Sequence, residues 1–166
     1  MSLPNDILRN VVYRSMIPGE EPEVCALVNR VFDVRVATEY TEEGVRTFLA
    51  YVESENLAKR VQHDHFVLVA ELRGALVGMI EMRKSAHVSL LFVEVPAQRK
   101  GIGRELLRRS LLLSHENRPE VEKITVHSAP SAVPAYEGLG FHITGSEQME
   151  HGIRFIPMIL DLTRRD

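Results

Sequence analysis

Tryptophan is absent from this sequence, cysteine occurs once, and neither sign of charge is in strong excess. The single cysteine, Cys25, excludes an internal disulfide framework and a zinc finger built on cysteines. Lys and Arg number 20 against 23 Asp and Glu, and the net charge of −3 argues against a general nucleic-acid binder. No apolar run approaches the roughly 18 residues that a membrane span requires. We therefore expect neither nucleic acid nor a membrane as a partner.

Targeting signals, linkers and repeats are missing as well. The polar N-terminus, Met1 to Asp6, has no apolar stretch typical of a signal peptide, so we predict a cytoplasmic protein. The 166 residues are 45% hydrophobic, and Pro and Gly are dispersed along them. A chain of this length buries roughly 68–70% of its unfolded surface, which supports a core without disulfides or metals. We predict a single domain over residues 1–166.

Hydrophobic periodicity in the first half predicts one strand, two helices and then three strands. The strand covers residues 11–16, one helix covers 20–33, and Thr41 is a typical cap for a second helix. Residues 33–40 are either a loop or a frayed helix end. Residues 65–71 and 75–81 form a predicted hairpin around the turn 72–74. The next strand, 87–95, is almost entirely apolar, which predicts that both of its faces are covered.

The second half continues with a helix from Ile102 to about Glu116. A strand over 121–128, a short helix over 130–138 and a closing pair of strands over 141–143 and 153–162 follow. Pro157 would need an edge position or a bulge, because proline has no N–H to donate. The predicted fold is mixed α/β, with a mostly antiparallel central sheet flanked by helices, in the order β-α-α-β-β-β-α-β-α-β-β.

A glycine turn connects the apolar strand to the following helix. Its pattern is Gln98-x-x-Gly101-x-Gly103, with Arg99, Lys100 and Arg104 around the glycines. The first N–H groups of a helix have no partner in the helix, and the helix dipole makes that end positive. Glycines also let a phosphate approach the backbone, so this pattern is typical of an anion site. The alternative is a plain strand-to-helix turn with surface arginines.

Other phosphate motifs do not fit this turn. Leu106 stands where a dinucleotide fingerprint needs its third glycine, and the GxxxxGK[ST] phosphate loop is absent. Two segments instead resemble the GNAT superfamily of N-acetyltransferases. The first segment is Leu91-Phe92-Val93, four residues, then Gln98-Arg99-Lys100-Gly101-Ile102-Gly103. The second is Ala132-x-x-x-Tyr136-Glu137-x-x-Gly140-Phe141.

This resemblance implies acetyl-coenzyme A as cosubstrate and no metal. The diphosphate would lie on the backbone of residues 98–104, and the pantetheine arm would lie along the preceding strand, opposite a diverging strand 121–128. The family often has Asn at the position of Ala129, so that polar contact is either missing or supplied by Ser128 or Ser131. The implied cofactor-binding residues are Leu91, Phe92, Val93, Gln98, Arg99, Lys100, Gly101, Ile102, Gly103, Arg104 and Ser128.

The resemblance also assigns catalytic roles. Tyr136 matches the family's general acid, and a phenol with its ordinary pKa of about 10 can protonate a leaving thiolate. The alternative for Tyr136 is a packed core tyrosine. His87 is a candidate base, because imidazole titrates near neutral pH, or else a solvent-facing histidine. Glu81 is the second candidate base and Glu94 the third.

No metal site is predicted. His63 and His65 could form part of one, but no third ligand is in obvious reach. The chain is therefore interpreted as an N-acetyltransferase whose acceptor is a small-molecule amine or a peptide or protein amine. The alternatives are a coenzyme A-binding regulatory module with weak or no catalysis and an unrelated α/β phosphate binder. By analogy with the family, a homodimer is possible.

Overall fold

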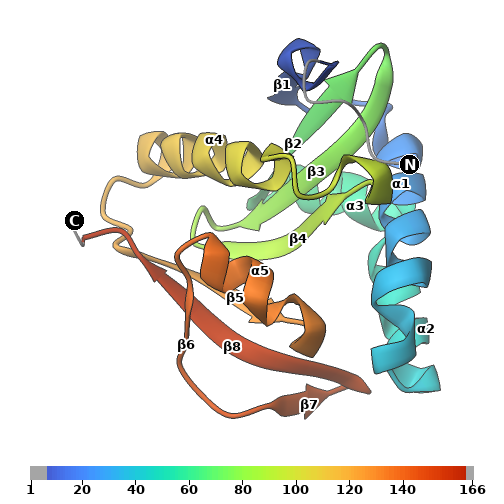
Figure 1. Ribbon diagram of the computed structural model, residues 1–166, viewed down its shortest axis with the longest axis vertical. Coiled ribbons are helices and arrows are strands. Elements are labelled where there is room, and N and C mark those ends of the chain that lie inside the picture. The colour runs from blue at the N-terminus through green and yellow to red at the C-terminus, as the bar shows by residue number, and fades with distance from the viewer. Residues whose placement is uncertain (1–6, 164–166) are drawn as a thin grey trace.

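The computed structural model describes residues 7–163 and arranges eight strands in one sheet (Figure 1). The spatial order is β1-β2-β3-β4-β5-β8-β6, and β7 pairs with β8. Their bounds are β1 Val12–Ser15, β2 His65–Leu72, β3 Ala75–Arg83, β4 His87–Val93, β5 Lys123–Ser128, β6 His142–Ile143, β7 Gln148–Glu150 and β8 Ile153–Asp161. All of these strand pairs are antiparallel except β4 with β5, which confirms the predicted mixed, mostly antiparallel sheet.

Helices cover both faces of this sheet. In Figure 1, α4 and α5 lie in front of the strands, whereas α1 and α2 lie at the side with α3 behind. The helices are α1 Glu21–Arg35, α2 Glu42–Tyr51, α3 Ser54–Val61, α4 Ile102–Asn117 and α5 Val133–Gly138. Short 3-10 turns are η1 Ile7–Asn10, η2 Ala37–Glu39, η3 Val95–Ala97 and η4 Pro130–Ala132. Within the described residues, no helix is long and apolar enough to cross a membrane.

Two elements of the structure, α3 and β7, were not predicted from the sequence. Of the α3 residues only Leu57 is buried, so its apolar signal is weak. All three residues of β7 are exposed, so it shows no alternation of apolar and polar residues. The ambiguous segment 33–40 contains both the end of α1 and the turn η2.

Two hydrophobic cores lie on opposite faces of the sheet. One core joins the sheet to α1, α2 and α3, and Phe32 of α1 stacks there on Phe48 of α2 at 4.0 Å between ring centroids. The other core joins the sheet to α4 and α5. Strand β4 contributes Leu90 to the first core and Val88 to the second. The prediction that both faces of this strand are covered is thus confirmed.

Two backbone details fix the second half of the sheet. A Cβ on Gly78 would lie 3.1 Å from Cγ2 of Ile102, so this glycine lets α4 pack closely on β3. Pro157 pairs with His127 of β5, and its carbonyl accepts the N–H of Thr144 at 3.0 Å. Since the N and the carbonyl of a residue face the same side of an antiparallel strand, the missing N–H of Pro157 faces the end of the short edge strand β6. Strand β8 is not itself an edge strand, because it lies between β5 and β6. The missing N–H of Pro157 nevertheless falls where β6 ends, so no ladder hydrogen bond is lost inside the sheet.

Candidate active site

The sheet divides between β4 and β5. These parallel strands pair only at His87 with Thr125 and at Val88 with Val126, and they then diverge. A bulge in β4 comes directly after the last of these pairs. Glu81 of β3 pairs with Leu90 and the next residue, Met82, pairs with Val88, so Ser89 is the extra residue of β4. The bulge increases the local twist of the strand, which turns β4 away from its neighbour. The predicted divergence of the two strands is therefore present.

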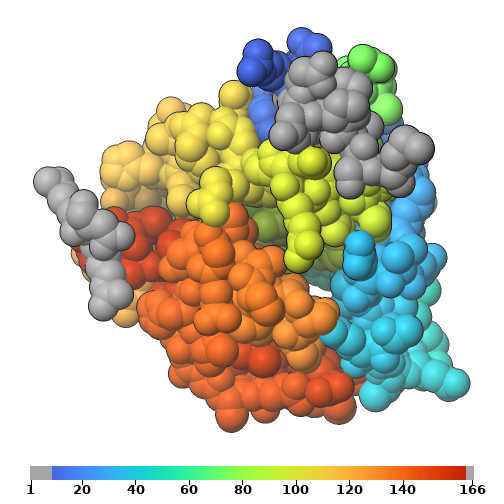
Figure 2. Space-filling view, viewed as in Figure 1, coloured from blue at the N-terminus to red at the C-terminus, as the bar shows by residue number. Residues whose placement is uncertain are grey.

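Beyond the last pair, the edge of β4 that faces β5 has no partner strand in the described part of the chain. Leu91, Phe92 and Val93 are only half-buried there, although all three are apolar. The N–H and C=O groups along such an unpaired stretch can bind an extended ligand as an additional strand would. Figure 2 shows the surface hollowed where the yellow-green, orange and blue segments of the chain meet. This hollow and the edge of β4 form the first part of the candidate site.

The glycine turn at the end of β4 forms the second part. The side-chain amide of Gln98 donates to the carbonyl of Val93 at 2.9 Å, which ties the turn to the strand. Gly101 caps α4 in the left-handed conformation with φ +90°, where a side chain would be strained. A Cβ on Gly103 would meet only Cγ2 of Val93, at 3.9 Å, so the space beside the first helical turn is open.

This geometry suits an anionic ligand. The first N–H groups of α4 have no partner within the helix, and the helix dipole adds positive potential there. The exposed Arg99 and Arg104 add cations, and Arg104 also donates to the carbonyl of Gly138 at 2.8 Å, at the end of α5. An unpaired strand edge that leads into a positive helix terminus suits an extended arm with amide groups followed by a diphosphate, as in a coenzyme A thioester.

Tyr136 lies in α5, the helix that follows β5 and the turn η4 in the chain. Its ring packs edge-on against Phe141, with 5.4 Å between ring centroids, and it contacts the second hydrophobic core. Burial first, and the nearby phenol of Tyr40 second, raise the pKa of Tyr136. Its hydroxyl therefore stays protonated at neutral pH and can serve as a proton donor.

Tyr40, which follows η2, was not singled out from the sequence. Its ring packs edge-on against Phe32 at 5.3 Å and Phe48 at 6.1 Å between centroids. Burial, and then the charge of Glu39, raise the pKa of Tyr40 to about 12. The sequence held no signal for this residue, because its segment showed no clear periodicity and belongs to no motif.

His87 begins β4 beside the start of β5. It lies on the opposite face from α4, since its neighbour Val88 points into the core beneath α4. Its Nδ1 is 2.7 Å from Oγ1 of Thr125, and its ring is edge-on to His127 at 5.0 Å between centroids. Burial first, and then the positive charges of Arg83, His127 and His65, lower the pKa of His87 to about 4. The expectation that His87 titrates near neutral pH is therefore corrected: the imidazole is neutral at pH 7.

Glu81, the second candidate base, is wholly buried in an ion-pair network. Arg60 donates to its two carboxylate oxygens at 2.8 and 3.0 Å. Nδ1 of His65 lies 2.6 Å from the same carboxylate, and the hydroxyl of Tyr51 is 3.4 Å away. Glu94, the third candidate, forms an ion pair with Arg30 of α1. Both carboxylates are thus already bound to cations.

Ser128 and Ser131 follow the divergence on the β5 side. Ser128 is buried, and its hydroxyl donates to the carbonyl of Ala129 at 2.8 Å. Ser131 is exposed, and its backbone N–H donates to Glu39 at 3.1 Å. As to the histidine pair, His65 lies against Glu81, and among residues 7–163 no group of three or more His, Cys, Asp or Glu is placed to hold a metal ion.

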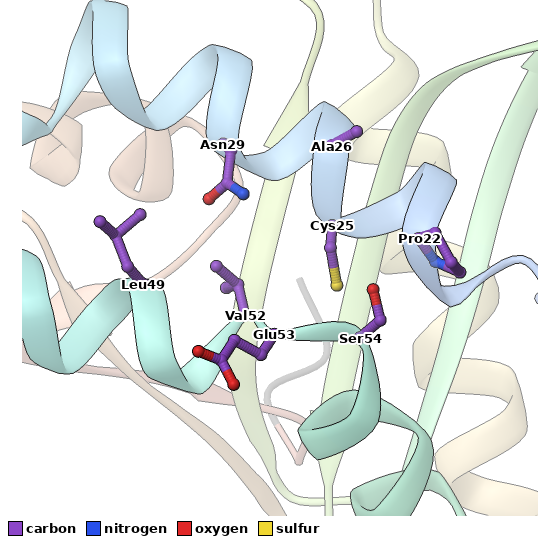
Figure 3. Close-up of a pocket in the computed structure, with 8 residues that line it drawn as sticks. All are labelled: Pro22, Cys25, Ala26, Asn29, Leu49, Val52, Glu53 and Ser54. Atoms are coloured by element: carbon purple, nitrogen blue, oxygen red, sulfur yellow. The ribbon is translucent and has the colours of Figure 1, made fainter.

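A second hollow, of about 360 Å³, lies in the helical layer (Figure 3). Cys25 of α1 faces Ser54 of α3 there, and Asn29, Leu49 and Glu53 line other sides. Burial raises the pKa of the Cys25 thiol, so it is not activated as a nucleophile. No lining residue of this hollow belongs to β4, β5, α4 or α5, and it is separate from the candidate active site.

Comparisons with known proteins agree with this geometry. Residues 36–162 match the family model described as an acetyltransferase (GNAT) domain. Among solved structures, the chain is similar to a GCN5-related N-acetyltransferase from Rhodopseudomonas palustris, with a TM-score of 0.78 and 19% identity over 91% of this chain and 95% of that one. It is also similar to the PaiA N-acetyltransferase of Thermoplasma acidophilum in complex with coenzyme A, with a TM-score of 0.76 and 16% identity over 91% and 98% of the two chains.

A third structure carries an acceptor in its name. It is a spermidine N-acetyltransferase chimera from Vibrio cholerae, with a TM-score of 0.63 and 19% identity over 93% of this chain and 96% of that one. At such identities the solved structures establish a shared fold. The family match covers most of the chain, from α1's end to the end of the last strand.

Proposed function

Because this chain belongs to the GNAT acetyltransferase family and is an acyltransferase, we propose that it transfers the acetyl group of acetyl-coenzyme A to an amine by direct attack. The observation that carries the proposal is the divergence of β4 from β5 after only two pairs, which leaves the edge of β4 unpaired up to the turn that begins α4. It combines, in one opening, an unpaired strand edge for an extended arm and a positive helix end for a diphosphate.

We propose that the backbone of residues 98–104 binds the diphosphate, with Arg99, Lys100 and Arg104 adding positive charge. The edge of Leu91 to Val93 would hold the pantetheine arm by backbone hydrogen bonds. A backbone N–H of β4 near the divergence would stabilise the negative oxygen that develops on the thioester carbonyl. Ser128 is already bonded to Ala129, so its contribution would come through its backbone.

Tyr136 is proposed as the general acid. In the transfer, the amine nitrogen forms a bond to the acyl carbon and the carbon–sulfur bond breaks. The leaving thiolate takes the hydroxyl proton of Tyr136, which solvent then restores. The raised pKa of Tyr136 keeps this hydroxyl protonated before the reaction, which the role requires.

His87 is proposed as the group that accepts the proton of the attacking amine. Its pKa of about 4 leaves the imidazole neutral at pH 7. When Nδ1 donates to Oγ1 of Thr125, Nε2 carries no proton and can accept one. Glu81 is less suited to this role, because Arg60 and His65 already bind its carboxylate.

The proposed acceptor is a small-molecule amine. Two of the similar structures are named for such acceptors, spermidine and an aminoglycoside. A peptide or protein amine, a homodimer and a cytoplasmic location remain predictions from the sequence.

Calorimetric titration with acetyl-coenzyme A tests the donor, with ATP and NAD as controls. The proposal predicts saturable binding of acetyl-coenzyme A alone, and an absence of binding would contradict it. Release of free thiol in a panel of small amines then tests the transfer. Binding without turnover of any amine would favour the alternative of a coenzyme A-binding regulatory module.

A further inference from the structure

Glu39 connects the two halves of the molecule across the opening. It lies in η2, between α1 and α2, and its Oε1 accepts the backbone N–H of Ser131 in η4 at 3.1 Å. The two residues are 92 positions apart in the sequence. The second carboxylate oxygen, Oε2, is buried and has no hydrogen-bond partner among residues 7–163.

Such an oxygen is uncommon in a folded protein. Leaving a buried acceptor without a donor destabilises the folded protein, and more so when the group is charged. An ionised carboxylate can only accept hydrogen bonds, so a donor is what Oε2 lacks. Charged donors make the strongest bonds to carboxylates. The oxygen is thus suited to an ammonium group.

The position of Glu39 places it on the acceptor side of the proposed reaction. It precedes Tyr40, and its charge contributes to the raised pKa of that phenol. The phenol of Tyr40 in turn contributes to the raised pKa of Tyr136, the proposed general acid. One tyrosine therefore separates Glu39 from the group proposed to protonate the thiolate.

Further carboxylates lie around this side of the opening. The first turn of α2 carries Glu42 and Glu43, and α2 contacts the turn between β7 and β8, where the N–H of Thr41 donates to the carbonyl of Gly152 at 3.3 Å. The acidic residues Glu147 and Glu150 flank or belong to β7.

The cation that faces Glu39 is Arg154 of β8. Glu39 contributes to its raised pKa, after the larger effect of its hydrogen bonds to Glu147. Those bonds, at 2.9 and 3.2 Å, hold the guanidinium on Glu147. Arg154 makes no hydrogen bond to Oε2 of Glu39, which has no partner among the described residues.

We propose that Glu39 is a specificity-determining residue that binds a positively charged ammonium group of the acceptor. This ammonium group is additional to the nitrogen that reacts. The inference rests on the proposed function. The bound ammonium is a different nitrogen from the attacking one, because a carboxylate stabilises the charged form of an amine and attack requires the neutral form. Amines with two or more nitrogens are therefore the class of substrate.

Calorimetric titration with two amines of equal chain length tests this assignment. The probes are 1,4-diaminobutane and butylamine, each titrated into the protein with and without bound coenzyme A. We expect the wild type to bind the diamine at least about tenfold more tightly than the monoamine. The substitution Glu39→Gln keeps an oxygen for the N–H of Ser131, removes the charge and replaces the other oxygen with an NH2 group that cannot accept a hydrogen bond. It should lower diamine affinity about tenfold and leave butylamine affinity unchanged.

Glu42→Gln is the matched control, because it removes the same charge from an exposed position three residues away. It should leave the diamine preference intact, and Glu39→Asp should restore part of it. An equal loss for both amines in Glu39→Gln, or no diamine preference in the wild type, would overturn the assignment. If the wild type does not bind coenzyme A, the proposed function is contradicted. The titrations of the two amines without coenzyme A would still test Glu39.

Discussion

The turn between β4 and α4 and the junction between η2 and η4 border the same opening, but they are built differently. The turn is continuous in sequence, from Gln98 to Arg104, and its chemistry comes from backbone N–H groups and cations. The junction joins Glu39 to Ser131 across 92 residues, and its chemistry comes from a carboxylate and phenols. The proposed anion site is thus encoded in one short segment, whereas the proposed acceptor side depends on long-range contacts.

The two regions also differ in how their charges are held. Glu105 of α4 pairs with Arg108 and Arg109 at the surface, where solvent screens the attraction. Behind the acceptor side, Glu81 is wholly buried and pairs with Arg60. A buried pair is costly to break, because the remaining charge has no compensation. Substitution of a charge should therefore cost more stability in this buried pair than in the surface pairs of α4.

The largest effect should come from Tyr136→Phe, which removes the hydroxyl and keeps the ring contact with Phe141. We expect kcat to fall roughly 100- to 10,000-fold, the range of a general acid, with little change in acetyl-coenzyme A affinity. Steady-state kinetics and calorimetry measure the two. Since the pKa of Tyr136 is raised, the wild type should show no alkaline loss of kcat below a pH of about 10.

Tyr40→Phe is the control for this substitution, because its hydroxyl lies on the other side of the opening. It should lower kcat much less. If Tyr136→Phe retained the wild-type rate while Tyr40→Phe lost it, the general acid would be Tyr40, after η2, rather than Tyr136 of α5, and the comparison would be reversed.

Arg60→Ala should produce the largest loss of stability. It leaves the buried carboxylate of Glu81 without its cation, so the free energy of unfolding should fall by about 3–5 kcal/mol. Urea denaturation at neutral pH measures this change. Arg108→Ala, at an exposed ion pair of α4, should change the stability little. Equal losses in the two variants would remove the distinction between the two regions.

Gly103→Val addresses the cofactor turn alone. The fold has room for a Cβ here, and a valine would occupy the space beside the first turn of α4 where the diphosphate is proposed to bind. Acetyl-coenzyme A affinity should fall about 100-fold, or ~2.7 kcal/mol, by calorimetry. The thermal midpoint should stay near that of the wild type, and Gly103→Ala should show a smaller loss. Unchanged affinity in the valine variant would contradict the assignment of the turn.

The smallest expected effect concerns His87. Its pKa is lowered to about 4, so protonation inactivates it only as the pH falls through that value. The ratio kcat/KM should therefore be flat near pH 6.5 and fall on the acid side near 4, with circular dichroism to verify that the protein stays folded. His87→Ala should lower kcat/KM and abolish the acid limb.

Arg83→Ala is the matched electrostatic test, because Arg83, His127 and His65 are the positive groups that lower the pKa of His87. Removing Arg83 should move the acid limb to higher pH. A profile that is unchanged in both variants would assign the proton acceptor to another group or to solvent.

Much of the cofactor side could be predicted because its signals are local. The apolar strand, Gly101 with its positive φ, and the helix that follows are neighbours in sequence, and each has a recognisable residue preference. The position of Tyr136 followed from a short motif. The acceptor side could not be predicted in this way, since Tyr40 and Glu39 belong to no motif and the partner of Glu39 is in another element.

Two of the proposed bases show the same limit. From the sequence, His87 was the first candidate and Glu81 the second, and both are polar residues at the ends of predicted strands. The fold buries Glu81 against Arg60, which comes from α3, a helix that the periodicity did not predict. It places His87 beside Thr125, and burial first, then Arg83 and His127, lower the pKa of His87. Both outcomes depend on which strands become neighbours.

The sequence by itself determined the alternation of strands and helices, the glycine turn at residues 98–104 and the place of Tyr136 in the family pattern. These follow from periodicity and backbone preferences, which act over a few residues. The tertiary structure alone decided the ionisation of His87, the burial of Glu81 and the meeting of Glu39 with Ser131. Solvation and charge–charge interactions set these properties, and both depend on groups that only folding brings together.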